Sequence, residues 1–169
     1  MTASEPLRPT HLEIDLDALA HNLRQIRARL DDGVAICPVV KADAYGHGIL
    51  AVAERLVREG ADLLGVAFVD EGVALRQSGI NVPILVLGPT MPEQAEEVVR
   101  HGLTPTLFTH SLRHALAQAA RRHKRRVGVH VKVDTGMGRL GLAPEEALRF
   151  LEDVASCGEI ELEGLCTHF

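Results

Sequence analysis

The chain has 169 residues, which is long enough for one sizeable core, and its content of 46% hydrophobic and 24% charged residues is that of an ordinary globular protein. Its net charge of −5 provides no electrostatic attraction to nucleic acid or anionic lipid. The three cysteines have no metal-type pair spacing, and an odd number without a framework is typical of a reducing cytosol. No apolar run approaches the ~18 residues of a membrane span, and the first residues lack a signal-peptide pattern, so we expect a cytoplasmic protein.

The first third of the sequence predicts two helices around one strand. Residues 11–15 alternate weakly and could form a strand. Apolar residues then recur at steps of three and four over 16–30 and predict a packing helix, with Asp15 or Asp17 as its cap. The apolar run 35–40 predicts a buried strand, and a helix is expected from about Gly48 to Glu59, stopped by a glycine.

The rest of the chain continues the alternation of strand and helix. The predicted strands are 63–67, 82–87, 103–107, 127–133 and 160–166, and the predicted helices are 70–78, 92–101, 111–122 and 144–155. This order is typical of an α/β fold with a parallel sheet and helices outside it. Strand spacing leaves two architectures open, a doubly wound sheet and a (β/α) barrel, which needs eight strands. No linker or repeat marks a domain boundary within 1–169.

Polar residues follow several predicted strands, which is where barrel enzymes carry their catalytic groups. Lys41 stands where a buried strand should end, and a buried ammonium is costly unless it is paired or loses its proton. Such a lysine is a candidate amine nucleophile, although a lone lysine more often snorkels to water. Arg139 lies among Gly136, Gly138 and Gly141, where one exposed guanidinium would suit a carboxylate.

Two motifs resemble one known family. Residues 39–48, VVKADAYGHG, closely resemble the pyridoxal-phosphate attachment signature of bacterial alanine racemases, and residues 132–141, KVDTGMGRLG, look like the second signature of that family. The segments 8–16 and 167–169 are also similar to it. The resemblance implies a (β/α)8 barrel followed by a β-rich domain in a homodimer. Residues 1–169 would then hold part of the cofactor-binding barrel, with the last strands and the β domain beyond them.

The resemblance also implies roles for the residues around the cofactor pyridoxal 5′-phosphate. Lys41 would carry the cofactor as a Schiff base and act as the base on one face of the substrate. Tyr45 would contact the cofactor phosphate, His168 would lie beside the pyridine ring, and Leu87 would line the ring. The opposing base of the family is a tyrosine of the partner subunit, and Tyr45 is the only tyrosine here, so we expect these residues alone to be inactive.

Three further positions take their roles from the same resemblance. Arg139 would bind the substrate carboxylate, and Lys132 would be carbamylated in order to position that arginine. Asp43 stands where many members have asparagine, a conservative departure.

The function expected from the resemblance is pyridoxal-phosphate-dependent interconversion of L- and D-alanine, which supplies D-alanine for peptidoglycan. A broad-specificity amino-acid racemase and a non-catalytic pyridoxal-phosphate-binding barrel of the homeostasis type are the alternatives. We expect no metal, no nucleic acid and no membrane as partner. His110 and His114 are four residues apart but lack a third ligand, and the basic run 121–126 is typical of a solvated helix end.

Overall fold

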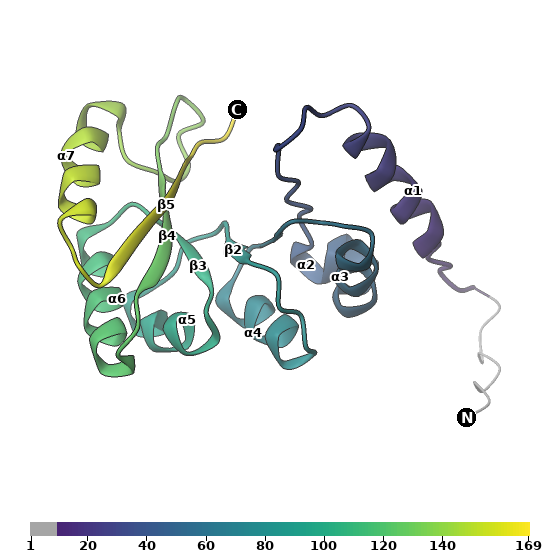
Figure 1. Cartoon of the computed structure of the whole chain (residues 1–169), viewed down its shortest axis with the longest axis horizontal. Coiled ribbons are helices and arrows are strands. Elements are labelled where there is room, and N and C mark those ends of the chain that lie inside the picture. The colour runs from purple at the N-terminus through teal and green to yellow at the C-terminus, as the bar shows by residue number, and fades with distance from the viewer. Residues whose placement is uncertain (1–9) are drawn as a thin grey trace.

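A computed structural model of the chain, which describes residues 10–169, shows strands and helices alternating along an open arc (Figure 1). The strands form one parallel sheet in sequence order: β1 (Leu64–Val66), β2 (Ile84–Val86), β3 (Thr104–Leu107), β4 (Val127–Lys132) and β5 (Ile160–Cys166). This order has none of the reversal that defines a doubly wound sheet. The prediction of an α/β fold with part of a barrel is confirmed.

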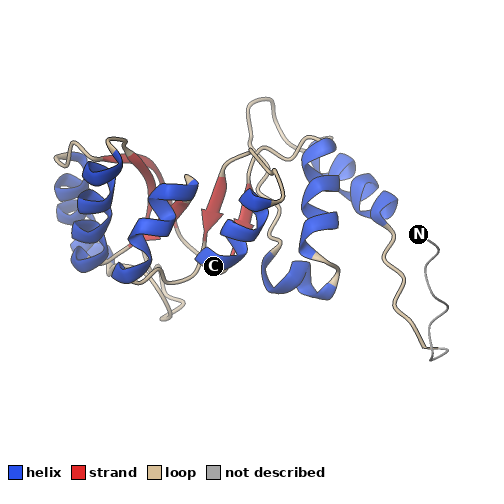
Figure 2. Cartoon of the chain, turned by 90° about the horizontal axis from the view of Figure 1, so that it is seen from below, coloured by secondary structure: helices blue, strands red, loops and turns tan. Residues whose placement is uncertain are grey.

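The helices lie on the outer side of this arc, and the first three of them precede β1, as Figures 1 and 2 show. They are α1 (Leu16–Arg27), α2 (Lys41–Gly46), α3 (Ile49–Arg58), α4 (Val69–Gln77), η1 (Pro92–Gln94), α5 (Ala95–His101), α6 (His110–His123) and α7 (Pro144–Ala155). Along β4 the side chains of Val127, Val129 and Val131 are buried, whereas Gly128 and His130 are only half-buried. This alternation places the aliphatic core between sheet and helices.

The start of α1 agrees with the sequence in one respect and differs in another. The Asp15 carboxylate accepts hydrogen bonds from the backbone N–H groups of Asp17 and Ala18, both at 2.9 Å, so the predicted aspartate cap is confirmed. The strand suggested for residues 11–15 is wrong, because they form no regular structure and lead into the cap. The first two residues of the segment 8–16, which resembles the family, lie outside the described part of the chain.

The strand predicted at 35–40 forms only in part. Val39 makes an isolated parallel bridge to Gly65. The Val40 N–H donates to the Gly65 carbonyl at 2.8 Å, and the Gly65 N–H donates to the Pro38 carbonyl at 2.9 Å. Pro38 has no N–H of its own, which limits the ladder on this segment. The segment nevertheless runs parallel to β1 and fixes the place at which Lys41 leaves the sheet.

Candidate active site

The predicted site residues lie at the carboxyl ends of neighbouring parallel strands. Lys41 comes two residues after the bridge between Val39 and Gly65, and Leu87 directly follows β2. Lys132 is the last residue of β4, and His168 follows the end of β5. Because parallel strands end at the same edge of a sheet, these residues share one rim, on the side where Figure 1 marks the C-terminus.

The turn that carries Lys41 is left-handed, which the sequence analysis missed. Ala42, Asp43, Ala44 and Tyr45 all have φ between 50° and 57°, so they form a single left-handed turn within α2. Each non-glycine residue in this region costs about 1–2 kcal/mol. A turn that accumulates such strain persists only where its surroundings over-determine it.

This turn brings the amine of Lys41 close to the aromatic ring of Tyr45. The Lys41 Nζ atom lies 5.8 Å from the ring centre, within the range of a cation–π contact. Lys41 is half-buried rather than buried, and Tyr45 is 59% exposed. A primary amine and a phenol therefore lie side by side at the rim, open to a ligand.

Asp43 joins the turn to the next helix. Its carboxylate accepts a hydrogen bond from the Ile49 N–H at 2.7 Å, and its carbonyl accepts one from the Gly48 N–H at 2.9 Å. Aspartate and asparagine are the non-glycine residues that best tolerate the left-handed region. Either residue offers an oxygen to the Ile49 N–H. An asparagine at position 43, which the family resemblance leads us to expect, would therefore accept the same hydrogen bond as the aspartate found here.

Leu87 lies against the segment that precedes Lys41. Its Cδ1 atom would be 3.0 Å from a Cβ added at Gly65, whereas Val39 and Cys37 occupy the other sides of that position. Gly65 thus leaves room for Leu87 on the inner side of the sheet. The Thr106 hydroxyl donates to the carbonyls of Leu87 and Gly88 at 3.4 and 3.3 Å, which holds the end of β2.

Lys132 is the charged residue buried most completely in residues 10–169. It is 7% exposed, and within that range its side-chain amine has no hydrogen bond or ion pair, whereas its carbonyl accepts from the Leu142 N–H at 2.9 Å. The neighbouring Cys166 thiol has a pKa raised by its burial and lowered to a smaller extent by the charge of Lys132. Among residues 10–169, the Lys132 amine is not one of the fully buried polar atoms that lack a partner, so the side chain is largely enclosed while its amine still reaches the surface.

The glycine-rich segment after β4 forms a loop closed by Asp134. The Asp134 carboxylate accepts hydrogen bonds from the N–H groups of Gly136 and Gly138, both at 3.0 Å. These bonds hold the pKa of Asp134 below its usual value. A Cβ at Gly141, whose φ is 130°, would lie 2.6 Å from the Asp134 nitrogen, so this position requires glycine. Arg139 is exposed on the loop.

The structure brings only some of the predicted site residues into contact. Lys41 and Tyr45 are neighbours, and the Thr135 and Thr167 hydroxyls, 2.6 Å apart, join the loop of Arg139 to the segment of His168. Between residues 10 and 169, Arg139 and His168 form no described ion pair or hydrogen bond. The positioning of Arg139 by Lys132 remains a prediction.

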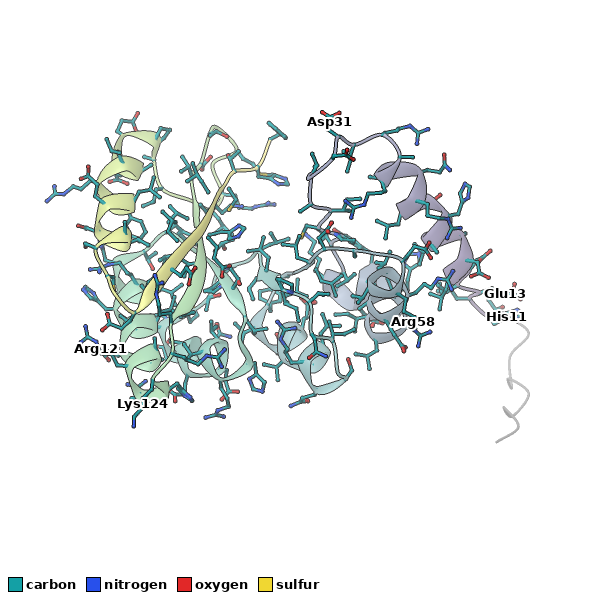
Figure 3. All side chains as sticks on the ribbon, viewed as in Figure 1. His11, Glu13, Asp31, Arg58, Arg121 and Lys124 are labelled. Atoms are coloured by element: carbon teal, nitrogen blue, oxygen red, sulfur yellow. The ribbon has the colours of Figure 1, made fainter. Side chains whose placement is uncertain are left out.

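The basic run 121–126 lies directly before β4, at the edge of the sheet opposite to the rim. Figure 3 shows Arg121 and Lys124 at the C-terminal end of α6. Arg121 pairs with Glu159 at 2.5 Å and lowers the pKa of that carboxyl to about 2, and Arg122 pairs with Glu96 at 2.7 Å. The run lies at the exposed C-terminal end of α6, as predicted, and two of its arginines form ion pairs that the sequence did not predict. In the described part of the chain, no cluster of three or more metal-ligating side chains is found, and the ring of His110 packs on Phe150 instead.

A profile of the family described as "Alanine racemase, N-terminal domain" matches residues 14–169. The chain belongs to this family. Alanine racemases from Desulfovibrio desulfuricans and Halothermothrix orenii are 49% and 46% identical to it over 96% of its length. This alanine racemase domain spans 44% and 43% of those two relatives, less than half of each.

Solved structures of family members have the same fold. Alanine racemase from Clostridium difficile 630, in complex with cycloserine, superposes with a TM-score of 0.93 at 40% identity, covering 98% of this alanine racemase domain and 46% of that chain. A histidine racemase from Leuconostoc mesenteroides is 30% identical with a TM-score of 0.83, covering 91% of the domain and 41% of that chain. None of the helices in residues 10–169 is long and apolar enough to cross a membrane.

Proposed function

We propose that this domain works within a pyridoxal-phosphate-dependent alanine racemase, a cytoplasmic homodimer that interconverts L- and D-alanine and supplies D-alanine for peptidoglycan. The observation that carries the proposal is the place of Lys41. Lys41 lies at the carboxyl-terminal rim of the sheet, with its amine 5.8 Å from the centre of the Tyr45 ring. The chain that carries it is 46–49% identical to alanine racemases. The neighbouring strand ends carry Leu87, Lys132 and His168.

The residues at the rim fit the proposed cofactor chemically. The half-buried amine of Lys41 suits the carbonyl carbon of pyridoxal phosphate, and the exposed phenol of Tyr45 offers a hydrogen-bond donor for the phosphate. Leu87 and the imidazole of His168 would lie against the ring. When bound, the cofactor supplies the delocalisation that stabilises a negative charge on the α-carbon of the substrate.

Two residues of this chain would move the α-proton of the substrate and bind its carboxylate. The neutral Nζ of Lys41 would take the α-proton on one face of the substrate and return it there in the reverse direction. Arg139 would bind the substrate carboxylate through its guanidinium fork, presented by the loop that Asp134 closes. The resemblance to the family implies that the base on the opposite face is a tyrosine of the partner subunit, and Tyr45 is assigned to the phosphate.

Lys132 would contribute as a carbamate. The ammonium loses one proton to give the neutral amine, and addition of carbon dioxide with loss of a second proton gives the carbamate, so that a cation is replaced by an anion at the end of β4. The largely enclosed side chain of Lys132, 7% exposed, supports this modification, because among the described residues its amine has no ion pair that would compete with carbon dioxide. The new anion would attract Arg139 toward the substrate.

A broad-specificity racemase is the second candidate. It is supported by the likeness to a histidine racemase at a TM-score of 0.83 and 30% identity, which shows that this fold is compatible with another amino acid. Substrate breadth depends on the side chains that surround the substrate's own side chain, and in this domain we place only Lys41 and Arg139 at the substrate, at its α-proton and its carboxylate.

The proposal is tested by measuring the appearance of D-alanine from L-alanine with the intact protein that contains this domain, with and without added pyridoxal phosphate. We expect cofactor-dependent racemisation that Lys41→Ala abolishes. Lys124→Ala is the matched control, because Lys124 is an exposed lysine at the far end of α6. Racemisation that survives Lys41→Ala would contradict the proposal, and faster racemisation of another amino acid would favour the second candidate.

A further inference from the structure

The left-handed turn after Lys41 is held by hydrogen bonds of two kinds. Most lie within the turn itself: the Ala44 N–H donates to Val40, and the Gly48 N–H donates to Asp43, both at 2.9 Å. These bonds fix the middle and the end of the turn. The peptide directly after Lys41 is held differently, by a side chain from another element.

That side chain belongs to Glu71, in the first turn of α4. Its Oε1 atom accepts a hydrogen bond from the Ala42 N–H at 2.6 Å. Its Oε2 atom accepts from the N–H groups of Ala67 and Phe68 at 2.7 and 3.2 Å. One oxygen thus closes the start of α4, while the other reaches across to the turn. Among the described residues, this bond ties the turn to α4, whereas the Asp43 carboxylate ties it to α3 by accepting from the Ile49 N–H.

The hydrogen bond between Glu71 and the Ala42 N–H lies where the left-handed turn begins. Ala42 is the first residue with positive φ, so the chain enters the strained conformation at the peptide that Glu71 holds. The backbone N–H of Ala42 adjoins Lys41, and its direction helps to set where the lysine side chain starts. No ion pair between Glu71 and Lys41 is found in residues 10–169, so the effect acts through the backbone.

We propose that Glu71 is a positioning residue for Lys41. By accepting the Ala42 N–H while its other oxygen is fixed at the start of α4, Glu71 holds the left-handed turn and aims the lysine amine at the ligand. The inference rests on the proposed function of Lys41. A displacement of about 1 Å at a reacting group can cost roughly a hundredfold in rate, so a backbone bond of this kind can matter for catalysis without touching the substrate.

The first test replaces Glu71 by glutamine in the intact protein. The amide has one acceptor oxygen where the carboxylate has two, so either Ala42 or the start of α4 loses its acceptor. Asp70→Asn is the matched control, because Asp70 is exposed in the same helical turn and undergoes the same change of charge. The rate at which added pyridoxal phosphate becomes fixed to Lys41 under borohydride is measured together with kcat, KM and Tm.

We expect Glu71→Gln to slow labelling of Lys41 and to lower kcat by roughly 10- to 100-fold, with KM within about twofold. Asp70→Asn should behave as the wild type. Unchanged labelling and kcat in a Glu71→Gln protein whose Tm has fallen would show that Glu71 only stabilises α4, and would overturn the inference.

A second variant separates positioning from simple stabilisation. Glycine adopts a φ of 50° without the penalty that alanine pays. Ala42→Gly in the Glu71→Gln protein should therefore recover labelling of Lys41 by roughly tenfold. If Glu71 acted only as a cap of α4, the glycine would leave the deficit unchanged.

The failure of the proposed function gives a different result. In that case the wild-type protein itself would not be labelled at Lys41. The amide exchange of Ala42 then still tests the inference: it should accelerate roughly tenfold in Glu71→Gln, corresponding to loss of one hydrogen bond, and an unchanged rate would contradict it.

Discussion

The hydroxyl oxygens of Thr135 and Thr167 lie 2.6 Å apart, which joins the loop that carries Arg139 to the segment that carries His168. Both threonines are exposed, and neither belongs to a regular element. The bond therefore links two proposed ligand-binding residues that the sequence separates by 29 positions (168 − 139).

Thr135→Val should loosen this link while keeping the shape of the side chain. Loss of one hydrogen bond of about 1 kcal/mol corresponds to roughly a fivefold rise in KM for alanine. Thr135→Ser retains a hydroxyl and should stay close to the wild type. Thr167→Val should have the same effect, and the double variant should add little to either single change, because both remove one interaction. Additive effects would contradict this account.

The Asp134 loop should lose its order at low pH. The pKa of Asp134 is lowered in the folded chain by the N–H groups of Gly138 and Gly136. A lowered pKa means that the stabilisation is present above the unfolded value of about 3.9 and is lost as pH falls through the folded pKa. The protection of the Gly136 and Gly138 amides against exchange, relative to the unfolded chain at the same pH, should therefore fall below about pH 4. Asp134→Asn should remove this pH dependence, whereas the exposed-site variant Asp70→Asn should keep it.

Asp43 should be replaceable by asparagine and not by alanine. Asparagine keeps an oxygen for the Ile49 N–H and tolerates the left-handed region, so Asp43→Asn should change the free energy of unfolding by less than about 0.5 kcal/mol. Asp43→Ala loses the acceptor and should cost about 1 kcal/mol. Chemical denaturation of the variants measures both changes. Equal loss in the two would show that the charge, rather than the hydrogen bond, stabilises the turn.

The guanidinium of Arg76, in the last turn of α4, joins the two segments that precede β2 and β3. Its nitrogens donate to carbonyl oxygens at 2.7–3.0 Å, those of Ile80, Val82, His101 and Gly102. Burial lowers the pKa of Arg76. Arg76→Met leaves these carbonyls without their donor and should lower the free energy of unfolding by about 2 kcal/mol or more. Arg100→Met, which removes an exposed pair with Glu97, should change it by less than about 1 kcal/mol.

The sequence predicted the alternating fold well, because its signals are local. Leucines at helical spacing and short apolar runs define α1 and β2 without knowledge of their partners. Gly60 and Gly102 both have positive φ and follow the ends of helices, as expected because a glycine in the sequence often marks the end of a helix. The strand at 35–40 was less predictable, since Pro38 weakens a ladder whose partner is distant in the sequence.

The family resemblance predicted which residues form the proposed site, but it did not predict the backbone geometry that holds them. Lys41 and Tyr45 could be named from their motif, but the left-handed turn between them had no local signal, because three of its four residues are not types that favour positive φ. Glu71 was missed for a physical reason. Its two oxygens look like an ordinary helix cap until the fold brings Ala42 within 2.6 Å of one of them.

The central claim is that the amine of Lys41 holds pyridoxal phosphate, and the chain offers a clean measurement. Its lysines are Lys41, Lys124 and Lys132, respectively half-buried, exposed and buried. The intact protein is loaded with pyridoxal phosphate, reduced with borohydride, digested and mapped by mass spectrometry. The account predicts the added mass on the peptide that contains Lys41, and its loss in Lys41→Ala. A label on Lys124 or Lys132 with Lys41 unmodified would contradict it.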